Sequence, residues 1–211
     1  MKQQLTKDLA IGLTHCSGHD NHEATPVTLT KAIDLHLDGV ISLSSARQLA
    51  RMQGFAIPES EEELKRLMQV SDDCKDLNEF LEKFAFPCSL LQTPEGQDTA
   101  TFNLCEELRA QGLIYAEIRF APSLSCEKGM TQKDAVKAVL EGMNRSSFRA
   151  NLILCCMRGN DAATNAETIR LTKNYLGKGV CAANLAGAEA LYPNKDIGFS
   201  AARLIILQQQ G

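Results

Sequence analysis

Three polar residues, Asp34, His36 and Asp38, alternate with apolar or small residues in the segment 33–39. Alternate side chains of a β-strand point to the same face, so these two carboxylates and the imidazole between them would line one face. Such a row is unusual for the interior of a barrel. The same spacing also suits a solvated edge strand, and the spacing alone leaves both interpretations open.

Further candidates stand at the ends of two later apolar runs. Glu117 and Arg119 are interpreted as an ion pair that holds the structure together, because buried charges need partners. Cys155 and Cys156 are adjacent, so at most one of them faces a barrel interior. Both are interpreted as packing residues, because no histidine is placed to act as their base. Arg158 follows them, and a solvated or loop-anchoring role is expected for it.

The N-terminal stretch is rich in potential metal ligands, namely His15, Cys16, His19 and His22. These residue types bind zinc well, but no second pair of ligands follows at zinc-finger spacing. We therefore interpret 1–26 as a polar arm. The eight cysteines include no C-x-x-C pair, which indicates reduced thiols rather than a disulfide framework. Together with the lack of a signal peptide or an apolar run of membrane-spanning length, this favours the cytoplasm.

The elements that must position these residues alternate along the chain. Apolar runs predict strands over 27–37, 113–122, 151–157 and 180–185, and helical periodicity or capping residues predict helices over 43–54, from 60, and over 76–84, 93–112, 131–143, 162–176 and 199–210. This order predicts a parallel α/β architecture. No glycine-rich phosphate-binding motif occurs, so a barrel with its site at the carboxyl ends of its strands is the better candidate.

Length and charge limit the function classes. The chain has 211 residues, of which 44% are hydrophobic and 23% are charged, with a formal net charge of −4. This composition is typical of a globular protein. A mildly acidic chain without a basic block is a poor candidate for binding nucleic acid or an anionic membrane.

The chain resembles the adenosine deaminases of the metal-dependent amidohydrolase superfamily. The resemblance covers about 27–207 and rests on six stretches in the family's order: KAIDLHLDG at 31–39, FLEKF at 80–84, SLLQTPEG at 89–96, YAEIRFAP at 115–122, LILCCMRG at 152–159 and NLAGAEA at 184–190. It implies a (β/α)₈ barrel with a helical lid after the first strand. It also implies zinc-dependent hydrolysis of adenosine or deoxyadenosine to inosine or deoxyinosine.

The resemblance assigns binding roles to individual residues. Asp38 matches the carboxylate that contacts the ribose hydroxyl, and Gly187 matches the glycine whose backbone N–H meets the purine ring. Phe80 and Phe84 match aromatic residues of the lid over the nucleoside. Asn184 stands where the family often has an aspartate.

His36 matches one histidine of the family's His-x-His metal motif, and the other histidine is absent. If Leu-Asp-Gly is the anchor of the alignment, His36 is the second histidine and Asp34 occupies the place of the first. If Ile-Asp-Leu-His is the anchor, His36 is the first histidine and two residues that include the second are missing. Asp34 is therefore an alternative, weaker zinc ligand.

The family's remaining catalytic groups have no counterpart in these 211 residues. Its acid glutamate, a further metal-binding histidine, a catalytic histidine and an Asp-Asp pair lie on later strands, which would follow Gly211. We therefore expect a barrel of about four βα units in 27–211 that is inactive by itself and has an incomplete zinc site. The alternative is a non-catalytic half-barrel that binds nucleoside or pairs with another chain, because exposed sheet edges recruit partners.

Overall fold

The computed structural model describes residues 32–70, 82–189 and 191–192. Its elements in chain order are β1 (Ala32–His36), η1 (Leu37–Gly39), α3 (Leu43–Gln53), α4 (Glu61–Met68), α6 (Ala85–Ser89), α7 (Pro94–Ala110), β2 (Tyr115–Phe120), η2 (Pro122–Ser125), α8 (Gln132–Arg145), β3 (Ala150–Met157), α9 (Ala162–Tyr175) and β4 (Val180–Ala186). The predicted arm, the predicted helix over 199–210 and most of the one over 76–84 lie outside the described residues.

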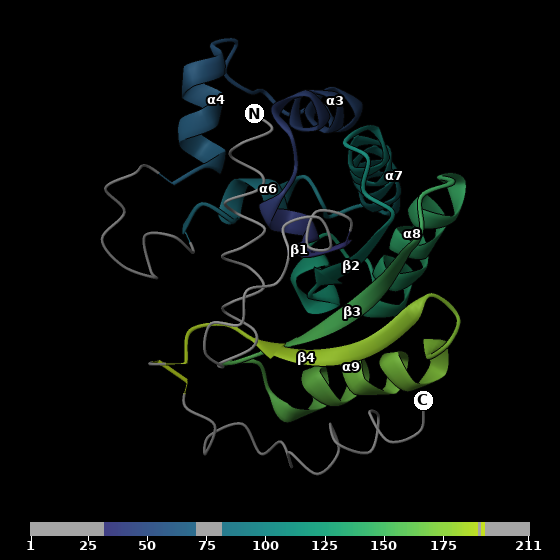
Figure 1. Cartoon of the computed structure of the whole chain (residues 1–211). Coiled ribbons are helices and arrows are strands. Elements are labelled where there is room, and N and C mark those ends of the chain that lie inside the picture. The colour runs from purple at the N-terminus through teal and green to yellow at the C-terminus, as the bar shows by residue number, and fades with distance from the viewer. Residues whose placement is uncertain (1–31, 71–81, 190, 193–211) are drawn as a thin grey trace, which may run out of the picture.

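The four strands form one parallel sheet in the order β1-β2-β3-β4 (Figure 1). The register places Asp34 beside Glu117 and His36 beside Arg119 on the neighbouring strand. Because the strands are parallel, their carboxyl ends meet at one side of the sheet, which we call the carboxyl edge. The predicted parallel α/β architecture is confirmed.

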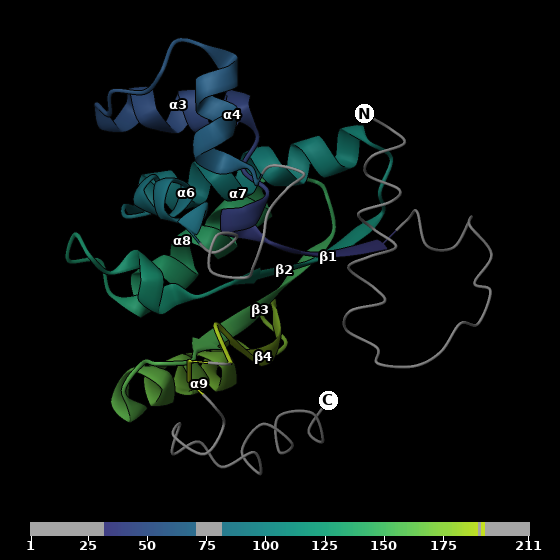
Figure 2. The same ribbon diagram turned by 90° about the vertical axis from the view of Figure 1, so that its left-hand side faces the viewer.

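The two faces of the sheet differ in polarity. One face is apolar and buried against the helices, with Leu35, Ile118, Leu152 and Leu154 at its centre. Burying each of these side chains contributes about 1.5–3 kcal/mol. The alternate residues form the opposite surface, which we call the polar face, defined by Asp34, His36, Tyr115, Glu117, Arg119 and Asn151. Side chains of α7, α8 and α9 share one core with this apolar face, and Figure 2 shows the arrangement of these helices around the strands.

Helices α3, α4, α6 and α7 all lie between β1 and β2 in the chain. Their ends are set by the residues that the sequence indicates. Ser60 accepts a hydrogen bond from the backbone N–H of Glu63 at the start of α4, and Thr93 accepts one from Gly96 at the start of α7. Within the described part of the chain, no helix combines the length and the apolarity that a membrane crossing requires.

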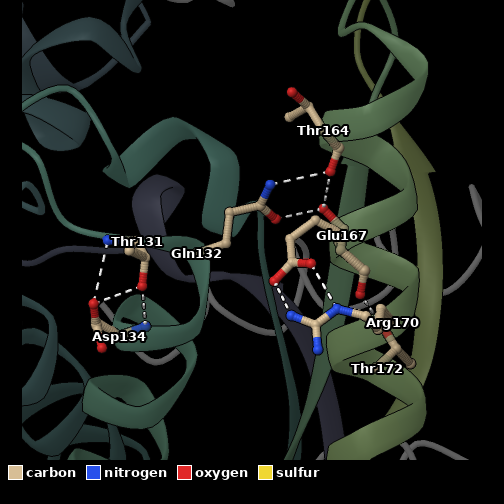
Figure 3. Close-up of polar contacts among 8 residues, drawn as sticks. Thr131, Gln132, Asp134, Thr164, Glu167, Arg170 and Thr172 are labelled. Carbon is tan, nitrogen blue, oxygen red and sulfur yellow. Dashed lines mark hydrogen bonds and ion pairs between the residues drawn. The ribbon is translucent and has the colours of Figure 1, made fainter.

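A buried glutamine joins α8 to α9 (Figure 3). Gln132 donates to the Thr164 carbonyl at 3.0 Å and accepts from the Thr168 hydroxyl at 2.7 Å. Directly before it, Thr131 caps α8 in a capping box with Asp134, as its sequence position predicts. These bonds hold α8 against α9, the helix that packs on β3, and Arg158 directly follows β3.

Candidate functional site

Asp38 has a carboxylate oxygen that could accept a hydrogen bond from a ligand. It lies in the short 3₁₀ turn η1 that continues β1 at the carboxyl edge. Its Oδ2 accepts a hydrogen bond from the Cys88 thiol, with 3.7 Å between sulfur and oxygen. Its Oδ1 is buried and has no hydrogen-bond partner among the described residues. A buried acceptor without a partner costs free energy, so this oxygen is suited to accept a hydrogen bond from a ligand hydroxyl.

Burial raises the pKa of the Asp38 carboxyl, and the nearby His36 and the hydrogen bond from the Cys88 thiol oppose that rise. Burial, with the Asp38 charge beside it, raises the pKa of Cys88 to about 12. The thiol therefore stays protonated at neutral pH and donates to the carboxylate. Nothing in the sequence pattern points to this pair, because Cys88 and Asp38 are 50 positions apart.

The segment that carries Cys88 is fastened by Gln92, whose side chain is buried. Gln92 donates to the carbonyls of Cys88 at 2.9 Å and Leu124 at 2.7 Å, and it accepts from the backbone N–H of Glu127 at 3.0 Å. One amide group thus ties α6 to the loop after β2. Gln92 belongs to the SLLQTPEG stretch that carries part of the family resemblance. The sequence alone did not indicate that its side chain connects these two segments.

Phe84 lies next to the turn that contains Asp38. A Cβ added at Gly39 would lie 3.2 Å from Cε1 of Phe84, so the ring packs directly against that glycine. Phe80 falls outside the described residues. Of the two predicted lid aromatics, the structure thus places Phe84 beside Asp38 at the carboxyl edge.

Gly187 follows β4 and also lies at the carboxyl edge. Its φ of +108° is in the region that favours glycine. Asn184 pairs in register with Cys155 on β3. The structure thus brings Asp38, Phe84 and Gly187 to the same end of the sheet.

Asp34 and Arg119 form an ion pair across β1 and β2, with Nε donating to Oδ1 at 2.7 Å and Nη2 contacting Oδ2. Glu117 instead accepts a hydrogen bond from the Tyr115 hydroxyl at 3.2 Å. The prediction that Glu117 pairs with Arg119 is therefore wrong, because the carboxylate that pairs with Arg119 is that of Asp34. The cause is the register, which places Asp34 within reach of the long arginine side chain.

The remaining candidates serve packing. Cys155 and Cys156 are both buried, and burial raises the pKa of each thiol to about 12. Cys156 donates to the Asn165 carbonyl on the helix side of the sheet. Neither is a thiolate at neutral pH, which agrees with the packing interpretation.

The described residues do not fit a zinc ion. They contain no group of three or more histidine, cysteine, aspartate or glutamate side chains placed to hold a metal. His36 is exposed at the end of β1, and both oxygens of the Asp34 carboxylate face Arg119. The arm residues His15, Cys16, His19 and His22 lie outside the described residues.

A hollow of about 280 Å³ opens at the other end of the strands. Tyr115, Ser146, Arg149 and Asn151 are among its lining residues. Asn151 donates to the Tyr115 hydroxyl at 3.0 Å there. This hollow lies at the amino ends of β2 and β3, away from Asp38 and Gly187.

The buried carboxyl of Asp38 predicts a pH-dependent stability. Because its pKa is raised on folding, the protonated form favours the folded state, and that contribution is lost as the pH rises through the folded-state pKa. Asp38→Asn is therefore expected to increase the free energy of unfolding at pH 7. The gain should disappear below the pKa of an unfolded aspartate, about 3.9. Urea unfolding across this pH range measures both effects.

Asp161→Asn is the matched control for that experiment. Asp161 caps α9 and accepts from the backbone N–H of Thr164 at 2.8 Å, and this bond lowers the pKa of its carboxyl. Its substitution should therefore lower stability at pH 7. If Asp38→Asn instead lowered stability at pH 7, as Asp161→Asn should, the burial of Asp38 would be contradicted.

The family model described as adenosine deaminase matches residues 30–204. Adenosine deaminase of Haemophilus ducreyi is 48% identical over 170 residues, which cover 76% of this chain and 49% of that protein. Adenosine deaminase of Clostridium perfringens is 39% identical over 159 residues, covering 73% and 48%. The chain spans about half the length of these curated relatives.

Solved structures share the fold. ADAL from Arabidopsis, complexed with GMP, superposes with a TM-score of 0.68 at 21% identity, covering 85% of this chain and 55% of that one. An amidohydrolase from Burkholderia ambifaria with bound Zn gives 0.64 at 17% identity, covering 86% and 51%. The four-stranded parallel sheet thus matches part of the barrel of amidohydrolases.

Proposed function

The chain belongs to the adenosine deaminase family, and from that membership we propose that its carboxyl edge binds a purine nucleoside within an adenosine deaminase-type barrel. The reaction of such a barrel is the hydrolysis of adenosine or deoxyadenosine to inosine or deoxyinosine and ammonia. The observation that carries the proposal is the buried Oδ1 of Asp38, which lacks a partner among the described residues. Solved neighbours hold GMP and IMP, which are purine ligands.

Each residue at the edge has a role in this binding. The Asp38 carboxylate accepts a hydrogen bond from a ribose hydroxyl, while Cys88 holds its other oxygen. The backbone N–H of Gly187 meets the purine ring, where the missing side chain permits close approach. Phe84, and Phe80 by its resemblance to a lid residue, cover the nucleoside. Of the helices between β1 and β2, those that precede α7 form this lid.

Zinc is the cofactor that the family resemblance implies, and one solved neighbour contains it. His36, with Asp34 as the weaker alternative, is the ligand that β1 offers. The described residues do not complete a zinc site, so we derive no hydrolytic step through the metal. The part of the reaction assigned to this chain is the binding and orientation of the nucleoside.

The described part of the chain corresponds to about the first four βα units of an eight-stranded barrel. Within it, β1 and β4 each pair with a single strand, which favours a second candidate function, a non-catalytic half-barrel that pairs with another chain or with itself through these edges. The described cysteines are free thiols, in keeping with the cytoplasm as the compartment.

Calorimetric titration tests the proposed binding. Adenosine is expected to bind about ten- to a hundredfold more tightly than 2′,3′-dideoxyadenosine, because a hydrogen bond to a charged group contributes about 1.5–3 kcal/mol. Asp38→Asn should remove most of this preference, and Asp161→Asn should leave it intact. Equal affinity for the two nucleosides in the unsubstituted protein would contradict the proposal.

A further inference from the structure

Two loops meet at the carboxyl edge, and Arg158 joins them. Arg158 follows β3 and Gly187 follows β4. The backbone N–H of Arg158 donates to the Ala186 carbonyl at 2.8 Å. A Cβ added at Gly187 would lie 3.3 Å from the Cβ of Arg158. The backbone of Gly187 therefore rests directly on the stem of the arginine.

The guanidinium of Arg158 continues along the segment after Gly187. Only 10% of the Arg158 side chain is exposed. Its Nη2 lies 3.4 Å from Oε1 of Glu189, and its Nη1 donates to the Tyr192 carbonyl at 3.3 Å. Arg158 thus holds the segment after Gly187 through a main-chain carbonyl, that of Tyr192, and through the side chain of Glu189.

A second contact between the loops supports the first. Gly159, with a φ of +86°, packs against the ring of Tyr192, and a Cβ there would lie 3.0 Å from Cζ. The backbone N–H of Tyr192 donates to the Ala188 carbonyl at 3.0 Å. The loop after β4 thus folds back over the loop after β3, with Arg158 between them.

We propose that Arg158 is a positioning residue that fixes the direction of the Gly187 backbone N–H toward the purine ring. The inference rests on the proposed function, in which Gly187 contacts the base. A glycine has no side chain to anchor it, so the orientation of its peptide depends on neighbours. Arginine suits this task because its planar fork donates to two acceptors in fixed directions, whereas lysine carries a single flexible ammonium.

The alternative role for Arg158 is general stabilisation of the fold. Glu189 is 66% exposed, and ion pairs with an exposed partner contribute little to stability. A stabilising role would weaken the binding of every ligand alike. If Arg158 has a positioning role, its loss would weaken only the contact that Gly187 makes. The pattern of lost affinities therefore distinguishes a positioning role from a stabilising one.

The test compares Arg158→Met and Arg158→Lys with Arg170→Met. Arg170 pairs with Glu167 within α9 at 2.6 Å and is exposed, so its substitution removes an arginine ion pair that lies outside the two loops. Hydrogen exchange of the peptide that contains Gly187 is measured first, without nucleoside. Affinities for adenosine and for its 1-, 3- and 7-deaza analogues are measured second.

In the unsubstituted protein, one deaza analogue should bind about three- to tenfold more weakly than adenosine, because it lacks the nitrogen that Gly187 contacts. Arg158→Met should speed hydrogen exchange at Gly187. It should also lower the affinity for adenosine to that for this analogue. Arg158→Lys should recover part of the preference, and Arg170→Met should preserve it.

Other results would overturn either the positioning role of Arg158 or the proposed function. Equal weakening of all four ligands in Arg158→Met, or unchanged exchange at Gly187, would overturn the positioning role while the proposed function stands. The absence of adenosine binding in the unsubstituted protein would overturn the proposed function, and this role with it, even if exchange at Gly187 responds to Arg158.

Discussion

Inserting an alanine and a histidine directly after His36 is expected to raise the affinity of the polypeptide for Zn²⁺ or Co²⁺ about tenfold or more, equivalent to ~1.4 kcal/mol or more. The insertion recreates the family's His-x-His spacing, which β1 lacks. Histidines two positions apart on a strand point to the same face. The insertion follows the last residue of β1, so the residues of β1 that precede it keep their faces.

The measurement is a titration with Co²⁺ followed by its visible absorption, and then displacement by Zn²⁺. Insertion of two alanines at the same place is the matched control and should leave the affinity unchanged. Any binding that survives His36→Ala belongs to residues elsewhere, such as those of the N-terminal arm. Tight, stoichiometric binding that depends on His36 without any insertion would show that the unmodified chain already holds the metal at β1.

Arg119→Met is expected to lower the free energy of unfolding by about 1–3 kcal/mol. The Arg119 and Asp34 side chains are 18% and 26% exposed. The pair is therefore intermediate between surface ion pairs, which contribute little to stability, and buried ion pairs, whose disruption costs several kcal/mol. Removing the guanidinium leaves the Asp34 carboxylate half-buried without its counter-charge. Urea unfolding of the single and double variants with Asp34→Asn measures the coupling between the two residues.

Glu117→Gln distinguishes the observed ion pair from the one that the sequence suggested. Glu117 accepts a hydrogen bond from Tyr115, and a glutamine can accept the same bond. Its coupling to Arg119 should therefore be below about 0.5 kcal/mol, whereas that of Asp34 should exceed 1 kcal/mol. The reverse order would mean that Arg119 pairs with Glu117 in solution.

The helices and strands could largely be predicted because each is specified by nearby residues. The apolar run at 151–157 predicts β3, which spans Ala150–Met157. Thr131 predicts the start of α8, where its side chain caps the helix. Gly54 predicts the end of α3 and adopts the left-handed conformation there. Such signals act within a few residues and need no knowledge of the tertiary structure.

The site could be predicted only in part, because its contacts join distant segments. Asp34 and Arg119 are 85 positions apart, and their pairing depends on the register of β1 against β2. The Cys88–Asp38 bond likewise depends on where α6 packs. The sequence pattern indicated which residues carry chemistry, while the packing determined that Asp34 faces an arginine and that one Asp38 oxygen is buried without a described partner.

We propose that these 211 residues bind a purine nucleoside without completing the hydrolytic site. The most direct test is the ultraviolet spectrum of adenosine incubated with purified, zinc-supplemented protein. Binding without conversion is predicted, so the spectrum should remain that of adenosine. Formation of inosine in proportion to the amount of protein, abolished by His36→Ala, would contradict the account.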